Sequence, residues 1–265
     1  MNSSAQPESP DAARYLDLAD GRRLAYHKTE AAPENSHLPT VVFLGGYSSD
    51  MTGAKATHLD TWANASGRAF LRFDYTGHGQ SSGAFEDGTV GAWAQDAQDA
   101  ITALSNGPLI LVGSSMGGWI SLLMIKRMPE RVAAFVGIAA APDFTEDEMW
   151  RWMTDAQKAE LEANGKVELP SDDGDPYTVT TKFIEDGRRN LVLRGPIRFD
   201  GPVRLLHGTK DEAIDMTVGL KLLDHLDASD ARLTLIKDGD HRLSEPRGTR
   251  PARCDDRRAL EAAQP

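Results

Sequence analysis

A serine between two glycines is the first feature of this sequence that could carry out chemistry. Residues 113–117 read Gly-Ser-Ser-Met-Gly, which fits the pattern G-x-S-x-G with Ser115 at its centre. By chance, such a pattern would occur in roughly one chain in ten of this length. The context is more specific, because the apolar run PLILVG precedes the motif and the run GWISLLMIKRM follows it. A serine at a tight strand-to-helix corner is held out toward a substrate, so Ser115 is the candidate nucleophile.

A serine hydroxyl is a poor nucleophile at neutral pH unless a base removes its proton. Three histidines follow Ser115, namely His207 inside a strand-like run, His225 on a helix face, and His241. The first two are better explained as packed or solvated side chains. His241 lies just after the last strand-like run, RLTLIK, where a loop can present it. We therefore predict that His241 is the base.

The base needs an acid that holds its ring and stabilises the imidazolium ion. Asp211 comes three residues after Gly208, which ends the run VRLLHG. Asp215 is the alternative, but it stands at the start of a predicted helix, where an N-cap role explains it. Asp211 is therefore the predicted acid.

Two backbone amides are candidates for stabilising the negative charge that develops on the reacting carbonyl. The N–H of Met116 opens the helix after Ser115, at the positive end of the helix dipole. The second candidate is the N–H of Tyr47, since Gly45 and Gly46 let the backbone there approach a substrate. The alternative is that these two glycines only form a tight turn.

The segments that must position these residues alternate between strands and helices. Strand-like apolar runs occur at residues 41–46, 69–74, 108–113, 132–139, 203–208 and 232–237, with helix-like periods between most of them. Apolar strands that do not alternate in polarity, separated by helices, indicate a parallel sheet covered on both faces. We therefore predict an α/β fold with a mostly parallel central sheet flanked by helices, preceded by a hairpin over residues 15–27.

The alternation is interrupted between residues 143 and 193, which we interpret as a small helical cap inserted into a single domain of residues 14–245. A Thr145…Glu148 pattern predicts a capping box at its first helix. Met149, Trp150 and Met153 in this segment are candidates for lining an acyl pocket, or they simply cover the edge of the sheet. Residues 1–13 are predicted to be a mobile lead-in, and residues 246–265 an atypical tail without ordered structure.

The composition excludes some classes of partner and predicts a compartment. The 265 residues include 40 acids and 29 bases, a net charge of −11 that disfavours binding to nucleic acid. One cysteine, Cys254, cannot form an intramolecular disulfide, and no apolar run reaches the roughly 20 residues of a membrane span. These features predict a cytoplasmic protein without a membrane span. No spacing of His, Cys, Asp or Glu matches a metal site.

Taken together, these residues resemble the α/β-hydrolase superfamily, and within it the branch of the mitochondrial palmitoyl-protein thioesterase, also known as mycophenolic acid acyl-glucuronide esterase. The similar stretches cover about residues 40–245 and read VVFLGGYSSDMTGAKA, RFDYTGHGQSSG, LVGSSMGGW, PVRLLHGTKDEAI and DHRLSEP. The resemblance implies an α/β-hydrolase fold with a small cap over the acyl pocket, and no cofactor. It also implies hydrolysis of acyl esters or thioesters by Ser115, Asp211 and His241. The family continues into an apolar final helix, from which residues 247–265 depart.

The predicted function is therefore that of a serine hydrolase acting on a small-molecule or acylated substrate through an acyl-enzyme intermediate. A carbon–carbon bond hydrolase or a haloperoxidase on the same scaffold would use the same three residues. A binding protein that keeps the fold without turnover is the alternative from another class, but such proteins usually lack a member of the triad. The sequence does not predict the oligomeric state.

Overall fold

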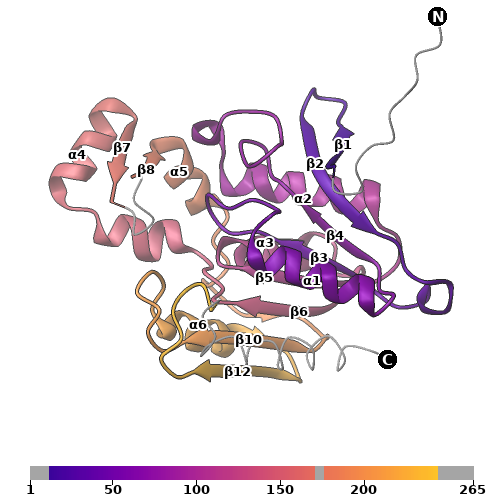
Figure 1. Ribbon diagram of the computed structural model, residues 1–265. Helices are drawn as coiled ribbons and strands as arrows, with labels where there is room; N and C mark the ends of the chain where they lie inside the picture. The colour runs from indigo at the N-terminus through magenta and orange to yellow at the C-terminus, as the bar shows by residue number, and fades with distance from the viewer. Residues whose placement is uncertain (1–11, 171–175, 244–265) are drawn as a thin grey trace, which may run out of the picture.

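An eight-stranded sheet forms the centre of the computed structural model, which describes residues 12–170 and 176–243 (Figure 1). Its order is β1-β2-β4-β3-β5-β6-β10-β12. The strands are β1 (Arg14–Asp17), β2 (Arg23–Thr29), β3 (Thr40–Leu44), β4 (Phe70–Phe73), β5 (Leu109–Ser114), β6 (Val132–Ile138), β10 (Val203–Gly208) and β12 (Ala231–Ile236). The predicted lead-in, apart from residues 12 and 13, and the whole of the predicted tail 246–265 lie outside the described residues.

The strands from β4 to β12 run parallel, while β1 and β2 form an antiparallel hairpin at one edge. All residues of β3, β4 and β5 are buried, as expected for strands covered on both faces. The predicted hairpin and the mostly parallel α/β sheet are thus confirmed.

Helices cover both faces of the sheet. Helix α1 (Ala54–Ala65) packs on one face through Ala56, Leu59 and Ala63. On the other face lie α2 (Val90–Leu104), α3 (Met116–Arg127) and α6 (Met216–His225), whose apolar side chains join the larger core cluster. No helix among residues 12–170 and 176–243 is long and apolar enough to cross a membrane.

A separate group of elements connects β6 to β10. It consists of a π-helix, η3 (Thr145–Trp150), then α4 (Asp155–Asn164), β7 (Lys166–Leu169), β8 (Tyr177–Thr180), α5 (Thr181–Arg189) and β9 (Ile197–Arg198). In Figure 1 the elements α4, β7, β8 and α5 lie beside the main sheet, on the side toward which the arrows of β6 and β12 point. This group occupies the place of the predicted cap; the division into one domain with an insertion remains a prediction. The remaining short elements are η1 (Pro33–Asn35), η2 (Phe85–Asp87) and β11 (Leu226–Asp227).

The capping box predicted at Thr145 and Glu148 is wrong. The helix that begins there is a π-helix without a side-chain cap, and the hydroxyl of Thr145 is buried with no hydrogen-bond partner. The reciprocal capping box forms instead between Thr154 and Gln157, at the start of α4. The pattern at residue 145 failed because Thr145 packs against Gly187 of α5, a tertiary contact that overrides the local signal.

The N-terminus of α3 lies directly against the end of β3. A Cβ atom added to Gly117 would overlap the carbonyl of Leu44 and would lie 2.7 Å from the carbonyl oxygen of Gly45. Helix and strand therefore meet backbone to backbone, which only glycine permits at this position.

This contact predicts that Gly117→Ala destabilises the protein by about 1–3 kcal/mol, because the helix must move away from β3. Urea unfolding followed by tryptophan fluorescence would measure the loss. Gly195→Ala is the matched control, since a Cβ at Gly195 meets nothing within 4 Å; its free energy of unfolding should stay within about 0.5 kcal/mol of the parent. Equal stability of the two variants would contradict the prediction.

Candidate active site

Ser115 stands at the corner between β5 and α3 in a strained backbone conformation. Its φ is 53° and its ψ is −120°, a backbone conformation that residues other than glycine rarely adopt. A Cβ on Gly113 would overlap the carbonyl of Gly117, so glycine on both sides of Ser115 is a steric requirement of the turn. Such strain persists only where the surrounding structure holds it, and it clusters at functional sites.

The structure brings the three predicted residues into one hydrogen-bonded row. Nε2 of His241 lies 3.0 Å from Oγ of Ser115, and Nδ1 of His241 lies 2.8 Å from Oδ2 of Asp211. An ionised carboxylate only accepts hydrogen bonds, so Nδ1 carries the ring proton and Nε2 is the free acceptor. In this tautomer the serine hydroxyl donates to Nε2, and the imidazole can take its proton.

The carboxylate of Asp211 is fully buried and hydrogen-bonded on both oxygens. Its Oδ1 accepts the N–H groups of Ala213 and Ile214, at 3.1 and 2.8 Å. Burial alone would raise the pKa of Asp211, but hydrogen bonds from His207 and His241 outweigh burial and lower it well below its usual range. Asp211 is therefore ionised at neutral pH, as the tautomer of His241 requires.

His207 contacts the same carboxylate, which the sequence alone did not indicate. It is 1% exposed in β10, and its Nε2 lies 3.3 Å from Oδ2 of Asp211. The expectation that His207 is a packed histidine holds for its burial but overlooks this contact. A polar residue in an apolar strand, four positions before the predicted acid, was the available signal.

The loops that carry the predicted acid, Asp211, and the predicted base, His241, are joined through their backbones. The N–H of Lys210 donates to the carbonyl of Gly239 at 2.9 Å, and a Cβ on Gly208 would overlap that same carbonyl. Asp215, the alternative acid, accepts the N–H of Thr217 at 2.8 Å and is the N-cap of α6, as expected. The acid and base loops are therefore set relative to each other by main-chain contacts.

The two candidate oxyanion donors, the N–H groups of Tyr47 and Met116, lie on two chain segments that come into contact at Ser115. A Cβ on Gly46 would be 3.3 Å from the Cβ of Ser115, so the backbone before Tyr47 passes directly over the serine. The amide of Met116 is in the first turn of α3 and has no intrahelical acceptor. A carbonyl oxygen placed over Ser115 would thus approach both segments.

The ring of Tyr47 packs in an aromatic cluster between the core and the cap. It stacks on Phe183 of α5 with ring centroids 5.2 Å apart, and it meets four further rings edge-on, those of Phe85, Trp93, Phe144 and Tyr177. Burial raises the pKa of the Tyr47 hydroxyl above its usual range, so the phenol stays neutral. The loop with the Tyr47 amide is thereby held by contacts from both sides.

The three candidate pocket residues of the cap have different surroundings. Met153 is 5% exposed within the main core cluster, and Met149 and Trp150 are partly buried against it. The guanidinium of Arg188 lies over the Trp150 ring, with its central carbon 4.5 Å from the ring centroid. Whether any of them contacts a substrate stays a prediction.

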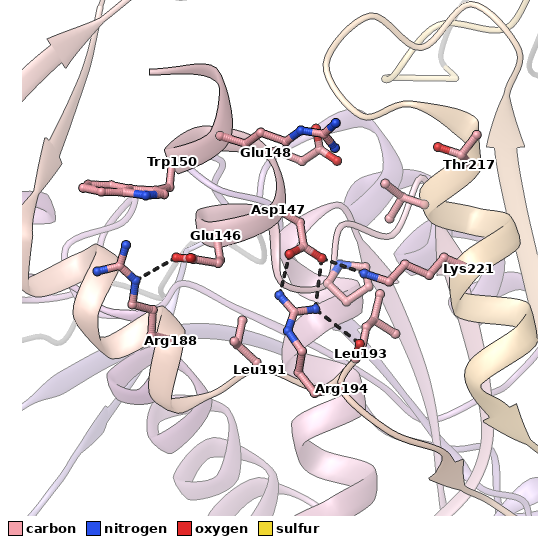
Figure 2. Close-up of a pocket in the computed structure, with 13 residues that line it drawn as sticks. Glu146, Asp147, Glu148, Trp150, Arg188, Leu191, Leu193, Arg194, Thr217 and Lys221 are labelled. Carbon is pink, nitrogen blue, oxygen red and sulfur yellow. Dashed lines mark hydrogen bonds and ion pairs between the residues drawn. The ribbon is translucent and has the colours of Figure 1, made fainter. Parts of the chain in front are cut away.

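Trp150 also lines a cavity of about 680 Å³ between η3, α5 and α6 (Figure 2). The residues that line this cavity do not include the three of the hydrogen-bonded row. Within it, the carboxylate of Asp147 lies between Arg194 and Lys221, the latter at 2.7 Å on α6. Because Lys221 belongs to a core helix, Asp147 links the start of the cap to the core.

Asp143 joins the start and the end of the cap. Its buried carboxylate accepts the N–H groups of Val192 and Leu193, at 2.7 and 2.9 Å, and pairs with Arg194 at 3.1 Å. Burial raises the pKa of Asp143 above its usual value, although these contacts favour the charged form.

Comparisons with known proteins identify the family and the fold. The profile of a family described as "Serine aminopeptidase, S33" matches residues 35–175. The chain is 36% identical over 233 residues to a mouse (Mus musculus) protein named palmitoyl-protein thioesterase ABHD10, mitochondrial, covering 87% of this chain and 76% of that protein.

Two solved structures are similar over nearly the whole chain. A putative hydrolase from Agrobacterium vitis has a TM-score of 0.87 and 40% identity, and the match covers 94% of this chain and 98% of that one. Alpha/beta hydrolase domain-containing protein 10 from mouse has a TM-score of 0.85 and 32% identity, and the match covers 95% of this chain and 99% of that one.

In the described part of the chain, no group of three or more His, Cys, Asp or Glu side chains could hold a metal ion.

The contacts of Asp143 predict that Asp143→Asn lowers the free energy of unfolding by about 1–3 kcal/mol. An amide offers one acceptor oxygen to two buried N–H groups, and its own NH₂ group then faces a donor. Chemical denaturation would measure the loss. Asp155→Asn, at an exposed carboxylate of α4, should change stability by no more than about 0.5 kcal/mol. A loss at residue 143 no larger than this control would refute the assignment.

Proposed function

The chain belongs to the α/β-hydrolase family of serine hydrolases, and on this premise we propose that it cleaves carboxylic esters or thioesters through an acyl-enzyme on Ser115. The observation that carries the proposal is the row of Ser115, His241 and Asp211, with 3.0 and 2.8 Å between its members. The relatives named palmitoyl-protein thioesterase support the choice of acyl esters and thioesters as substrates.

In the first half of the reaction, Oγ of Ser115 attacks the acyl carbonyl carbon while Nε2 of His241 takes the hydroxyl proton. The carbonyl π electrons move to its oxygen, which becomes an oxyanion. His241 is then an imidazolium ion, and the buried carboxylate of Asp211 stabilises its charge. The imidazolium gives its proton to the departing alkoxide or thiolate as the tetrahedral intermediate collapses.

In the second half, water attacks the carbonyl carbon of the acyl-enzyme ester, and the bond from that carbon to Oγ of Ser115 then breaks. His241 takes a proton from the water and returns it to Oγ, which releases the acid and restores the enzyme. The N–H groups of Tyr47 and Met116 are the proposed donors to the oxyanion in both halves. The backbone contact between Gly46 and Ser115 supports this assignment, because it keeps both segments beside the reacting carbonyl.

The proposed substrates are acylated molecules, and the cap residues Met149, Trp150 and Met153 remain candidates for contacting the acyl chain. The proposed location is cytoplasmic, as the single cysteine and the lack of a spanning segment in the sequence suggest. The mammalian relatives carry the word mitochondrial in their names, so imaging of the tagged protein in its own cells is the appropriate test.

A fluorophosphonate probe should label Ser115 covalently, because the probe reacts with serines activated by a neighbouring base. Ser115→Ala should abolish labelling, and His241→Ala and Asp211→Asn should each lower turnover of p-nitrophenyl acetate by about 10³–10⁴-fold. His225→Gln, which alters a histidine of α6 outside the row, should retain activity. A folded parent protein that the probe does not label would refute the proposal.

A profile across acyl chains of two to sixteen carbons, on oxygen and sulfur leaving groups, should give turnover on at least one thioester or ester series. Alkoxide and thiolate leaving groups each accept one proton from His241 after the attack by Ser115. Ser115→Ala should therefore abolish turnover of the oxygen esters and of the thioesters alike. Turnover of β-diketones with none of either acyl series would favour the alternative of a carbon–carbon bond hydrolase instead.

A further inference from the structure

Two imidazole rings share one oxygen of the buried acid. Oδ2 of Asp211 lies 2.8 Å from Nδ1 of His241 and 3.3 Å from Nε2 of His207. A Ser-His-Asp mechanism requires only the first of these contacts. The second contact comes from His207, a residue of strand β10 that is only 1% exposed and is therefore too buried to touch a substrate at the protein surface.

The protonation of His207 follows from its neighbours. Its Nε2 lies 2.9 Å from the carbonyl oxygen of Ile214 and 3.3 Å from Oδ2 of Asp211, and both of these oxygens accept hydrogen bonds. Nε2 must therefore carry a proton, which it shares between the carbonyl and the carboxylate. His207 is a donor to the acid in both its neutral and its charged form.

The surrounding structure makes room for this ring. A Cβ added to Gly219 of α6 would lie 3.1 Å from Nδ1 of His207, tighter than ordinary contacts, so glycine at 219 allows the helix to pass close to the ring. The ring is thus held between α6 and the acid loop. Its donor edge points to that loop, and its other edge faces the helix backbone.

We propose that His207 is a positioning residue that fixes the rotation of the Asp211 carboxylate and draws part of its charge away from His241. This proposal rests on the proposed function. Oδ1 accepts two backbone amides, and Oδ2 contacts both His241 and Nε2 of His207, so the carboxylate has partners on both oxygens that oppose its rotation. An acid that contacts two imidazole rings stabilises the imidazolium form of His241 less than an acid that contacts only one.

The test is His207→Phe, which keeps a ring of similar size but removes the Nε2 donor. The rate of fluorophosphonate labelling should fall by about tenfold, because the carboxylate can rotate and the ring of His241 then spends less time in the orientation that accepts the proton of Ser115. The midpoint of the acidic limb of the rate–pH profile should move up by about half a pH unit, because the carboxylate now directs its charge at His241 alone. Turnover of p-nitrophenyl acetate should show the loss in kcat and not in KM.

His207→Gln is the conservative variant, because its amide NH₂ can reach the same two oxygens. It should recover most of the labelling rate and return the acidic limb toward that of the parent. His225→Gln is the control, since this histidine bonds the carbonyl of Lys221 on its own helix at 2.8 Å and should leave the limb unchanged. Circular dichroism checks that each variant is folded.

Three results would overturn the proposal. The first is a His207→Phe variant whose labelling rate and acidic limb are both unchanged. The second is a His207→Phe variant that is labelled more slowly with an unchanged acidic limb, while His207→Gln does not recover the labelling rate. That second result would indicate a packing role alone. The third needs no variant: ¹⁵N-histidine NMR of the parent should show His207 protonated at Nε2, and a ring protonated only at Nδ1 would refute the assignment. A parent protein that is never labelled would refute the proposed function instead, so the two failures are distinguishable.

Discussion

Close packing of two backbones, where α3 begins and β3 ends, is the constraint on which the rest of the site depends. Without a side chain at Gly117, the helix approaches the carbonyls of Leu44 and Gly45. That approach sets Ser115 under the loop that leads to Tyr47, and it holds the serine at a positive φ that it would not keep alone. Ser115, the proposed nucleophile, and the two amides proposed to stabilise the oxyanion are therefore parts of one junction.

Much of this arrangement could be predicted because chain order and sheet geometry together determine it. Ser115, Asp211 and His241 each follow a strand that the sequence marks by an apolar run, and the carboxyl ends of parallel strands meet at the same edge. Their juxtaposition then follows without knowledge of any side-chain contact. Asp215 is distinguishable from Asp211 for a similar reason. The start of a predicted helix explains why an aspartate stands at position 215, whereas no such structural role explains Asp211.

The features that escaped prediction depend on contacts between residues far apart in the sequence. The capping box failed at Thr145 because Gly187, in a later helix, packs against that side chain. The pair β7 and β8 was not anticipated in a stretch that reads as polar, and the links from Asp143 and Asp147 to Arg194 span about fifty residues. His207 was assigned to packing because its strand is apolar; which loop its ring faces depends on how β10 and the acid loop fold back on each other.

The sheet order also bears on how the protein is made. The proposed base lies 126 residues after the serine, on a loop that follows the edge strand β12, which pairs with β10. At usual rates of synthesis a ribosome needs on the order of ten seconds to cover that separation. A nascent chain therefore contains Ser115 for some time before its proposed base, His241, has been synthesised. On the proposed mechanism, a chain that has not reached residue 241 has no base for Ser115, and catalysis begins only when the loop after β12 is in place.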